Sequence, residues 1–220
     1  MSIKNNIERL KESLPVECSL IAVSKTQPVD KIQEAYNAGQ RIFGENKAQE
    51  LAQKYEVMPR DIQWHMIGHL QSNKVKYIAP FVQLIHSVDS LKLLVEINKQ
   101  ALKNNRKINC LLQIHIADEE TKFGFSEAEV MELLQANELK ILTNIKITGL
   151  MGMATLTEDV DKIRTEFKTL KSLFEKIKLM NIPSVEMKEL SMGMSNDYKI
   201  AIEEGSTLIR VGTAIFGERN

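Results

Sequence analysis

The sequence of 220 residues has few cysteines, few aromatic side chains and no long apolar run. The two cysteines, Cys18 and Cys110, lie in apolar strand-like segments, and we expect buried free thiols, which are typical of a reducing compartment. No apolar run approaches the roughly 18 residues that a membrane-spanning helix needs. Residues 1–14 have the spacing of an amphipathic helix and not of a signal peptide. We therefore predict a cytoplasmic protein without a membrane segment.

The charge balance and the missing motifs exclude several functional classes. Lys+Arg and Asp+Glu number 29 each, so composition provides no attraction toward nucleic acids or acidic membranes. Aromatic residues make up 5% and are not interleaved with basic clusters, which disfavours a surface for single-stranded nucleic acid. Neither GxGxxG nor GxxxxGK[ST] occurs, so a dinucleotide site and a P-loop have no support. We predict that nucleic acid is not a partner.

Short apolar segments alternate with longer amphipathic segments along the whole chain. The predicted strands are 19–23, 40–43, 63–67, 84–87, 110–116, 146–151, 189–192 and 208–211. The intervening segments have helical spacing and recognisable ends: Pro28 and Gly39 bracket one helix, and Ser126 with Glu129 forms a capping box. Strict alternation favours an α/β fold with a parallel sheet, and eight strands favour a closed (β/α)8 TIM barrel, with residues 1–220 as a single domain. An open doubly wound sheet also satisfies the alternation.

Lys25 lies where the first predicted strand ends and a helix follows. Because (β/α)8 barrels keep their chemistry at the carboxyl ends of the strands, we expect the Lys25 amine to lie in a strand-end pocket. A poorly solvated amine loses its proton more readily than a surface amine and can attack a carbonyl carbon to form a Schiff base. Lys25 is therefore the principal candidate for chemistry.

Small and hydroxylated residues follow the last two predicted strands, at 191–197 and 205–213. Such segments supply backbone N–H groups and hydroxyls for a phosphate, and barrel phosphate sites commonly use the loops after strands seven and eight. The alternative is that these residues only form turns. Arg210 alternates with apolar neighbours, so we expect it to face the barrel interior, where its charge needs a core carboxylate or a ligand atom as acceptor.

Asn46 follows the second predicted strand, and His65 lies in the third. Both are therefore further candidates for the lining of the strand-end cavity. For His65, a hydrogen-bonded core histidine is the preferred interpretation over a catalytic one. His65 and His69 do not share a strand face, and no glutamate follows His65 as HExxH requires, so we predict no metal site. The similar segments 149–154 and 190–195 indicate two strand ends that face one cavity.

Five motifs extend over nearly the whole chain. They are AVSKTQP at 22–28, FGEN at 43–46, WHMIG and LQSNK within 64–74, SMGMSND at 191–197, and GSTLIRVG and IFG within 205–217. Together they resemble the pyridoxal phosphate homeostasis protein family. The resemblance implies a single-domain TIM barrel like the N-terminal domain of bacterial alanine racemase, with pyridoxal 5′-phosphate (PLP) as its cofactor. It also implies that Lys25 holds PLP as a Schiff base, while the phosphate is held by Ser195, Gly212 and Thr213.

The same resemblance implies that Arg210 lies near the pyridine nitrogen or reaches the phosphate, and that Asn46 lies along the cofactor ring. A cation beside the nitrogen disfavours its protonation, so the ring would be a weaker electron sink. In the racemase, a tyrosine from a second, C-terminal β-domain supplies an acid/base on the opposite face of the cofactor. The present sequence ends at Asn220, and its four tyrosines fall in helical patterns, so we expect neither that domain nor that base.

The resulting hypothesis is a PLP carrier or regulator rather than an enzyme. It would hold the cofactor with little or no turnover and serve PLP homeostasis, with PLP-dependent apoenzymes as recipients. Because the barrel needs no partner to complete its site, we expect a monomer. The alternatives are a minimal PLP-dependent amino-acid racemase, a Schiff-base aldolase acting on a phosphorylated sugar, and a pure interaction scaffold.

Overall fold

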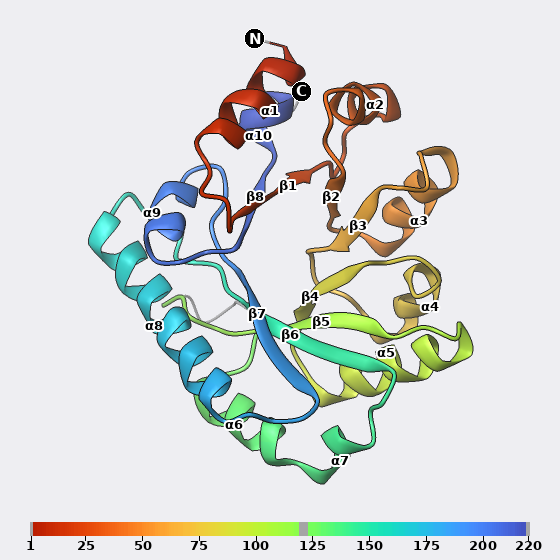
Figure 1. The fold of residues 1–220 in the computed structure, drawn as a ribbon, viewed down its shortest axis with the longest axis vertical. Coiled ribbons are helices and arrows are strands. Elements are labelled where there is room, and N and C mark those ends of the chain that lie inside the picture. The colour runs from red at the N-terminus through yellow and green to blue at the C-terminus, as the bar shows by residue number, and fades with distance from the viewer. Residues whose placement is uncertain (1, 119–122, 219–220) are drawn as a thin grey trace.

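The computed structural model describes residues 2–118 and 123–218 and contains a closed barrel of parallel strands (Figure 1). The strands are β1 (Ser19–Val23), β2 (Ile42–Glu45), β3 (Gln63–Met66), β4 (Leu84–Val88), β5 (Ile108–Gln113), β6 (Ile145–Met151), β7 (Val185–Ser191) and β8 (Leu208–Val211). They follow one another around the barrel in chain order, and β8 pairs with β1 to close it. The predicted (β/α)8 barrel is confirmed, and the open sheet is excluded.

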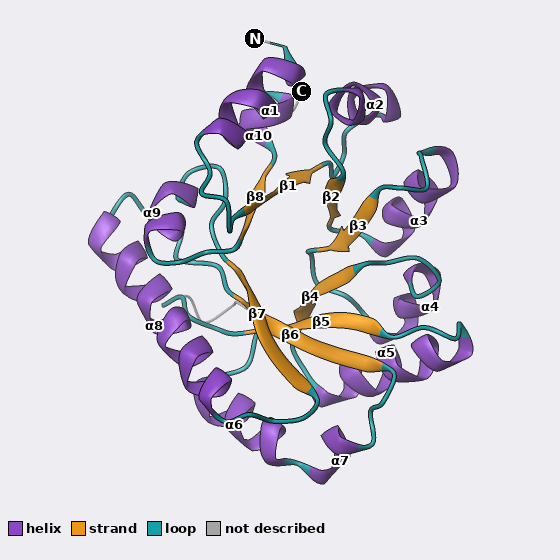
Figure 2. Ribbon diagram, in the orientation of Figure 1, coloured by secondary structure: helices purple, strands orange, loops and turns teal. Residues whose placement is uncertain are grey.

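Helices surround the ring of strands on its outside (Figure 2). They are α1 (Ile3–Glu12), α2 (Val29–Asn37), α3 (Ala48–Val57), α4 (Val75–Ile78), α5 (Leu91–Lys103), α6 (Glu127–Gln135), α7 (Asn137–Lys140), α8 (Val160–Leu179), α9 (Tyr198–Glu203) and α10 (Thr213–Phe216), with a 3-10 helix η1 (Ser72–Lys74). The first and last helices lie side by side (Figure 1), where the Asn6 side-chain amide donates a hydrogen bond of 3.0 Å to the Ile215 carbonyl oxygen.

The predicted helix ends are confirmed where they rest on capping chemistry. Pro28 is the N-cap of α2, and Gly39 follows that helix with φ of +85°, a conformation that glycine adopts without strain. The capping box of α6 is formed: the Glu129 backbone N–H donates to Ser126 Oγ (3.2 Å), and the Ser126 backbone N–H donates to Glu129 Oε2 (2.8 Å).

Strand boundaries and one-turn helices are the less accurate part of the prediction. The predicted strand 40–43 is displaced, because the Gln40 side-chain amide donates to the Leu20 and Ile42 carbonyl oxygens (2.8 and 2.7 Å) and holds residue 40 in the preceding turn. β5 begins and ends earlier than predicted. The helices α7 and α10, four residues each, were not predicted, since a single turn is too short to show a periodic pattern.

Two apolar layers stabilise the barrel. The larger layer lies between strands and helices and includes Cys18 and Cys110, both buried free thiols as predicted. The smaller layer is formed mainly by strand residues that face the interior of the barrel. Its buried members are Ile21, Leu84, Leu111, Met151 and Leu208. Side chains therefore fill the barrel, as is usual for this fold.

A chain of buried polar side chains also crosses the interior. His65 Nδ1 lies 3.0 Å from His86 Nε2, and His86 Nδ1 lies 2.9 Å from Ser191 Oγ. Arg210 donates to the same Ser191 oxygen at 2.5 Å. These side chains come from β3, β4, β7 and β8, so the chain connects opposite sides of the barrel. His65 is 4% exposed and hydrogen-bonded, which confirms the interpretation of this residue as a core histidine.

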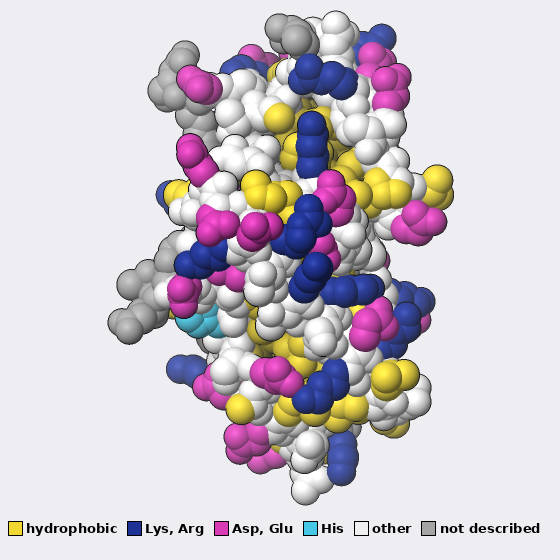
Figure 3. Space-filling model, turned by 90° about the vertical axis from the view of Figure 1, so that its left-hand side faces the viewer, with side chains coloured by type: hydrophobic (Ala, Val, Ile, Leu, Met, Phe, Trp, Pro, Cys, Tyr) yellow, Lys and Arg dark blue, Asp and Glu magenta, His cyan; other side chains and the backbone are white. Residues whose placement is uncertain are grey.

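The face of the molecule that carries α8 has charges of both signs interspersed (Figure 3). Arg164 is paired with Glu203 and Glu204 of the neighbouring α9 region, and Lys171 is paired with Glu175 along α8. This face therefore has no broad patch of a single sign. Among the described residues, no helix combines the length and the apolar character needed to cross a bilayer.

The two interior histidines predict a loss of stability in mild acid. Burial lowers the pKa of His65 to about 3, and burial together with His65 and Arg210 holds the pKa of His86 well below its ordinary value of 6.5. Below about pH 6.5 these histidines therefore become protonated in the unfolded chain, while they remain neutral in the folded barrel. Stability is full above that pH and is lost as the pH falls toward the folded pKa. At pH 5 we expect His65 to contribute a loss of about 2 kcal/mol, and the lowered pKa of His86 acts in the same direction.

Urea unfolding of the wild type and of His65→Gln at pH 7 and pH 5 measures this effect. The difference between the two pH values should shrink by about 2 kcal/mol in the variant. His69→Gln, at a histidine whose side chain is 43% exposed, is the control for the loss of an imidazole outside the barrel interior. An unchanged difference in His65→Gln would show that His65 does not resist protonation in the fold.

Candidate functional site

A cavity of about 740 Å³ opens at the carboxyl ends of the strands. Its lining comes from the segments that follow β1, β2, β3, β6, β7 and β8 and from the start of α8. All the residues that the sequence predicted for a cofactor line this one cavity: Lys25, Asn46, Ser195, Arg210, Gly212 and Thr213. The structure thus brings together side chains that are up to 188 positions apart (213 − 25). The cavity lies where (β/α)8 barrels carry their sites.

Lys25 is positioned by the turn that leaves β1. Ser24 before it is fully buried, Lys25 itself is half-buried, and Thr26 after it is exposed. The Gln27 backbone N–H donates to the Ser24 carbonyl oxygen at 3.0 Å and closes the turn around Lys25. Thr26 has φ of +64°, which is unfavourable for a β-branched residue and requires support from its surroundings. The Lys25 side chain therefore leaves a buried strand end through a constrained turn.

The segment after β7 places Ser195 in a tight turn. The Met194 backbone N–H donates to Asp197 Oδ1 at 2.5 Å and closes residues 194–197. Gly193 has φ of +93°, and a Cβ at this position would lie 2.5 Å from the Ala201 Cβ, so only glycine fits. Met153 and Ala154 line the same cavity as Met194 and Ser195, which confirms that the two similar segments face one cavity.

Gly212 and Thr213 follow β8 on the neighbouring side of the cavity. A Cβ at Gly212 would lie 3.2 Å from the Val23 carbonyl oxygen, so glycine allows the end of β8 to approach the end of β1 closely. This approach places the hydroxyl of Thr213 and the backbone of Gly212 beside the turn that carries Lys25. Phosphate oxygens commonly accept hydrogen bonds from hydroxyl groups and from accessible backbone N–H groups.

Arg210 is buried beneath the cavity. Its guanidinium donates to Ser191 Oγ (2.5 Å) and to the Gly152 carbonyl oxygen (3.1 Å), both of which are neutral groups. Burial lowers the pKa of Arg210 to about 10, and the negative charge of Asp197 opposes this shift. Arg210 therefore remains a cation at neutral pH and gives the floor of the cavity a positive charge. The sequence predicted an acceptor of opposite charge or a ligand atom, whereas these two hydrogen bonds go to uncharged oxygens.

Several residues of the site escaped the sequence analysis. A Cβ at Gly68 would lie 2.6 Å from the Asn46 carbonyl oxygen, so Gly68 is what allows Asn46 to reach the cavity. The segment 155–157 also lines the cavity, and Glu166 of α8 holds it by accepting from the Thr155 N–H and hydroxyl at 2.7 and 2.6 Å. Two sequence features could have indicated these residues. They are the glycine in the WHMIG motif and the hydroxyl residues that follow segment 149–154.

The ionisable groups of the described cavity lining are few: Lys25, Asp197 and Arg210. No tyrosine or histidine is among these residues. The tyrosines lie in α2, α3, α4 and α9, outside the lining, as the helical patterns predicted. In the parts of the chain that the structure describes, no three His, Cys, Asp or Glu side chains gather as a metal site would need. The cavity thus combines one amine, one buried cation, one carboxylate and several hydroxyl groups.

Comparison with known proteins agrees with this arrangement. The family model for the alanine racemase N-terminal domain matches residues 1–220. The pyridoxal phosphate homeostasis protein of Aquifex aeolicus is 42% identical over 201 residues, which cover 91% of this chain and 86% of the relative.

Solved structures give the same result. PipY of Synechococcus elongatus, solved without PLP, is 36% identical with a TM-score of 0.92, covering 98% of this chain and 100% of that chain. The same protein solved with PLP bound is 35% identical, with a TM-score of 0.87 and the same coverage. Alanine racemase of Bartonella henselae shares the fold at 17% identity and a TM-score of 0.75, covering 98% of this chain and 58% of the racemase. The chain belongs to the alanine racemase N-terminal domain family and, within it, to the pyridoxal phosphate homeostasis proteins.

Proposed function

We propose that this protein binds PLP as a Schiff base on Lys25 and serves cytoplasmic PLP homeostasis with little or no catalytic turnover. In this proposal the whole chain acts as one PLP-binding domain, works as a monomer and passes its cofactor to PLP-dependent apoenzymes. The observation that carries the proposal is that Lys25 and the predicted phosphate donors line the same cavity. Support also comes from PipY, 35% identical, whose structure was solved with PLP bound.

The residues of the cavity match the chemical groups of PLP. The Lys25 amine suits the aldehyde, and the hydroxyls of Ser195 and Thr213 with the Gly212 backbone suit the phosphate. Arg210 suits the pyridine nitrogen or the phosphate, and Asn46 suits the edge of the ring. Joining the unprotonated Lys25 nitrogen to the aldehyde carbon releases one water molecule, so the linkage needs no oxidant or reductant. When bound, PLP supplies an electron sink for carbanion chemistry.

The surroundings of the cavity favour retention over turnover. Arg210 is a buried cation, and a second positive charge beside it is costly, which disfavours protonation of a nearby ring nitrogen. Two-base racemisation also needs an acid/base on each face of the ring. Lys25 can serve one face, but the described lining contains no tyrosine or histidine for the other. A carrier is therefore the better fit than a racemase.

Replacing Lys25 with alanine tests the covalent linkage. The wild type mixed with PLP should develop the absorption band of a Schiff base, and borohydride should fix the cofactor to Lys25, as mass spectrometry of peptides would show. Lys25→Ala should lose both signals because the nucleophilic amine is gone. Lys47→Ala, an exposed lysine outside this cavity, is the control and should behave as the wild type.

The same samples distinguish the alternative functions. A protein that takes no colour from PLP but forms a borohydride-fixed adduct with a phosphorylated sugar would be an aldolase. Racemisation of a common amino acid at ordinary enzymatic rates would overturn the carrier hypothesis. Unchanged cofactor handling by Lys25→Ala would instead support a pure interaction scaffold.

The proposed phosphate site predicts that loss of its hydroxyl groups weakens the binding of PLP but not that of pyridoxal. Ser195→Ala with Thr213→Ala removes two hydroxyl donors, and each hydrogen bond to a charged phosphate contributes about 1.5–3 kcal/mol. We expect the double variant to bind PLP at least about tenfold more weakly per hydroxyl. Pyridoxal, which has the aldehyde but no phosphate, should bind wild type and variant equally. Equal weakening of both ligands would place the phosphate elsewhere. Spectrophotometric titration measures both affinities.

A further inference from the structure

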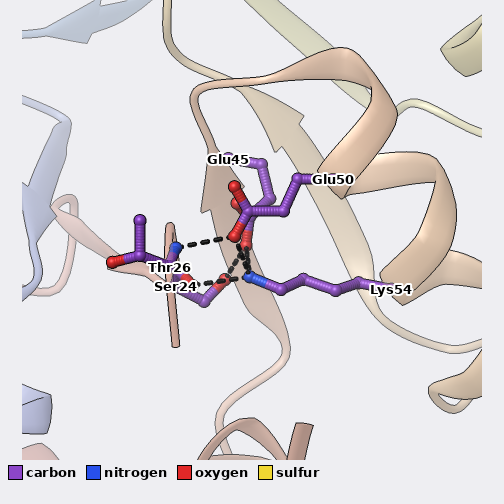
Figure 4. Close-up of polar contacts among 5 residues, drawn as sticks. All are labelled: Ser24, Thr26, Glu45, Glu50 and Lys54. Atoms are coloured by element: carbon purple, nitrogen blue, oxygen red, sulfur yellow. Dashed lines mark hydrogen bonds and ion pairs between the residues drawn. The ribbon is translucent and has the colours of Figure 1, made fainter. Parts of the chain in front are cut away.

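A cluster of charged and polar residues with a buried centre lies beside the turn that carries Lys25 (Figure 4). It is formed by Ser24 and Thr26 on either side of Lys25, by Glu45 at the end of β2, and by Glu50 and Lys54 of α3. Glu45 is 0% exposed and Lys54 is 6% exposed, which is unusual for both residue types. The cluster does not line the cavity described above, so binding of the cofactor itself does not account for it.

Lys54 is the centre of this cluster. Its ammonium donates to the Ser24 carbonyl oxygen, to Glu45 Oε1 and to Glu50 Oε1, each at 2.7 Å. These three hydrogen bonds use all three protons of the ammonium group. A lysine with a flexible stem is thereby fixed in one geometry, which ties β1, β2 and α3 together at the rim of the barrel.

Both neighbours of Lys25 are anchored to this centre. The Ser24 hydroxyl donates to Glu45 Oε1 at 2.6 Å, and its carbonyl oxygen accepts from Lys54. The Thr26 backbone N–H donates to Glu50 Oε1 at 2.6 Å. Glu50 is also held by Lys54, four residues further along α3. The backbone is therefore fixed immediately before and immediately after Lys25.

The Thr26 anchor coincides with the strained residue of the turn. Thr26 has φ of +64°, and a threonine adopts this conformation only when its surroundings enforce it. A short hydrogen bond from its N–H to a carboxylate is a strong interaction of the kind that can enforce it. Without the Glu50 carboxylate, the turn would be free to relax toward a negative φ, and the direction of the adjoining Lys25 side chain would change.

We propose that Glu50 and Lys54 are positioning residues that aim the Lys25 amine into the cavity. The inference rests on the proposed function of Lys25 and assigns these two residues a role toward the amine without contact to the cofactor. Their contribution is to the covalent step, because bond formation requires the amine to approach the aldehyde carbon closely and in the correct direction. Non-covalent binding of the phosphate and ring depends on other residues, which follow β2, β7 and β8.

The charges of the cluster agree with this role. Burial raises the pKa of Glu45, while Lys54 and Ser24 oppose the shift. Burial alone would also raise the pKa of Glu50, but the hydrogen bonds from Lys54 and Thr26 outweigh it and bring that pKa below its ordinary value. Glu50 is therefore a carboxylate at neutral pH and a strong acceptor for the Thr26 N–H. Glu45 Oε2 is buried without a hydrogen-bond partner among the described residues, so Glu45 depends on Lys54 for compensation.

Glu50→Ala is the variant that tests the proposal with the least damage to the fold. It removes the Thr26 anchor but leaves the buried Lys54–Glu45 pair and both Ser24 hydrogen bonds in place. The probes are PLP and pyridoxine 5′-phosphate, an alcohol that has the same phosphate and ring but cannot form a Schiff base. We expect the rate of borohydride-trapped adduct formation at Lys25 with PLP to fall about tenfold to a hundredfold. Affinity for pyridoxine 5′-phosphate should stay at the wild-type value.

Two further variants complete the experiment. Glu50→Gln keeps an oxygen that can accept from the Thr26 N–H, and it should restore most of the covalent rate. Glu56→Ala removes another glutamate of α3, which accepts a hydrogen bond from Arg60, and should match the wild type. An equal loss for both probes in Glu50→Ala would indicate a merely structural role, and no loss for either would show that the anchor is dispensable; both results overturn the proposal. A wild type that forms no adduct at Lys25 would overturn the proposed function itself, and the inference with it.

Discussion

The pairing of β8 with β1 is the constraint on which the site depends. Ala22 is the ladder partner of Val211, so the first and last strands run side by side although almost the whole chain separates them. Lys25 follows on one side of this ladder and Gly212 on the other, and both therefore reach the same rim of the barrel. If this strand order were left open, β1 and β8 would lie at opposite edges of the sheet. Closure of the barrel therefore brings Lys25 close to Gly212 and Thr213, which are distant from it in the sequence.

The second constraint is the positive charge buried below that rim. Arg210 is held by Ser191 Oγ and the Gly152 carbonyl oxygen, and Ser191 is held in turn by the neutral pair His86 and His65. A buried cation without such partners would be strongly unfavourable. The polar chain therefore lets the barrel keep a guanidinium under the cavity in an apolar interior. In the proposed complex, this charge attracts an anionic ligand and at the same time weakens the pyridine ring as an electron sink.

Whether a feature of the fold or of the candidate site could be predicted from the sequence depends on how its interacting residues are brought together. The carboxyl ends of parallel strands share one rim, so finding the strands was sufficient to predict that Lys25 and the hydroxylated segments after the last two strands would lie at the same rim. The cluster around Lys54 was not predictable in this way. In the sequence, Glu50 and Lys54 resemble any exposed ion pair on an amphipathic helix, and their burial follows only from the packing of α3 against β1 and β2. The contact between His86 and Ser191, 105 residues apart, likewise needs the closed barrel.

A carrier and a catalyst built on this barrel differ in what surrounds the amine, since the fold alone does not determine function. Hydrogen bonds that fix both neighbours of Lys25 would serve a carrier as well as a catalyst, because both need the amine to be oriented toward the aldehyde carbon. Two-base racemisation requires in addition a group that exchanges protons on the opposite face of the ring. In the described lining, Arg210 stays protonated and Asp197 is engaged in closing the turn 194–197. These contacts hold Arg210 and the turn 194–197 in place beside the cavity, which agrees with the proposed role in PLP homeostasis.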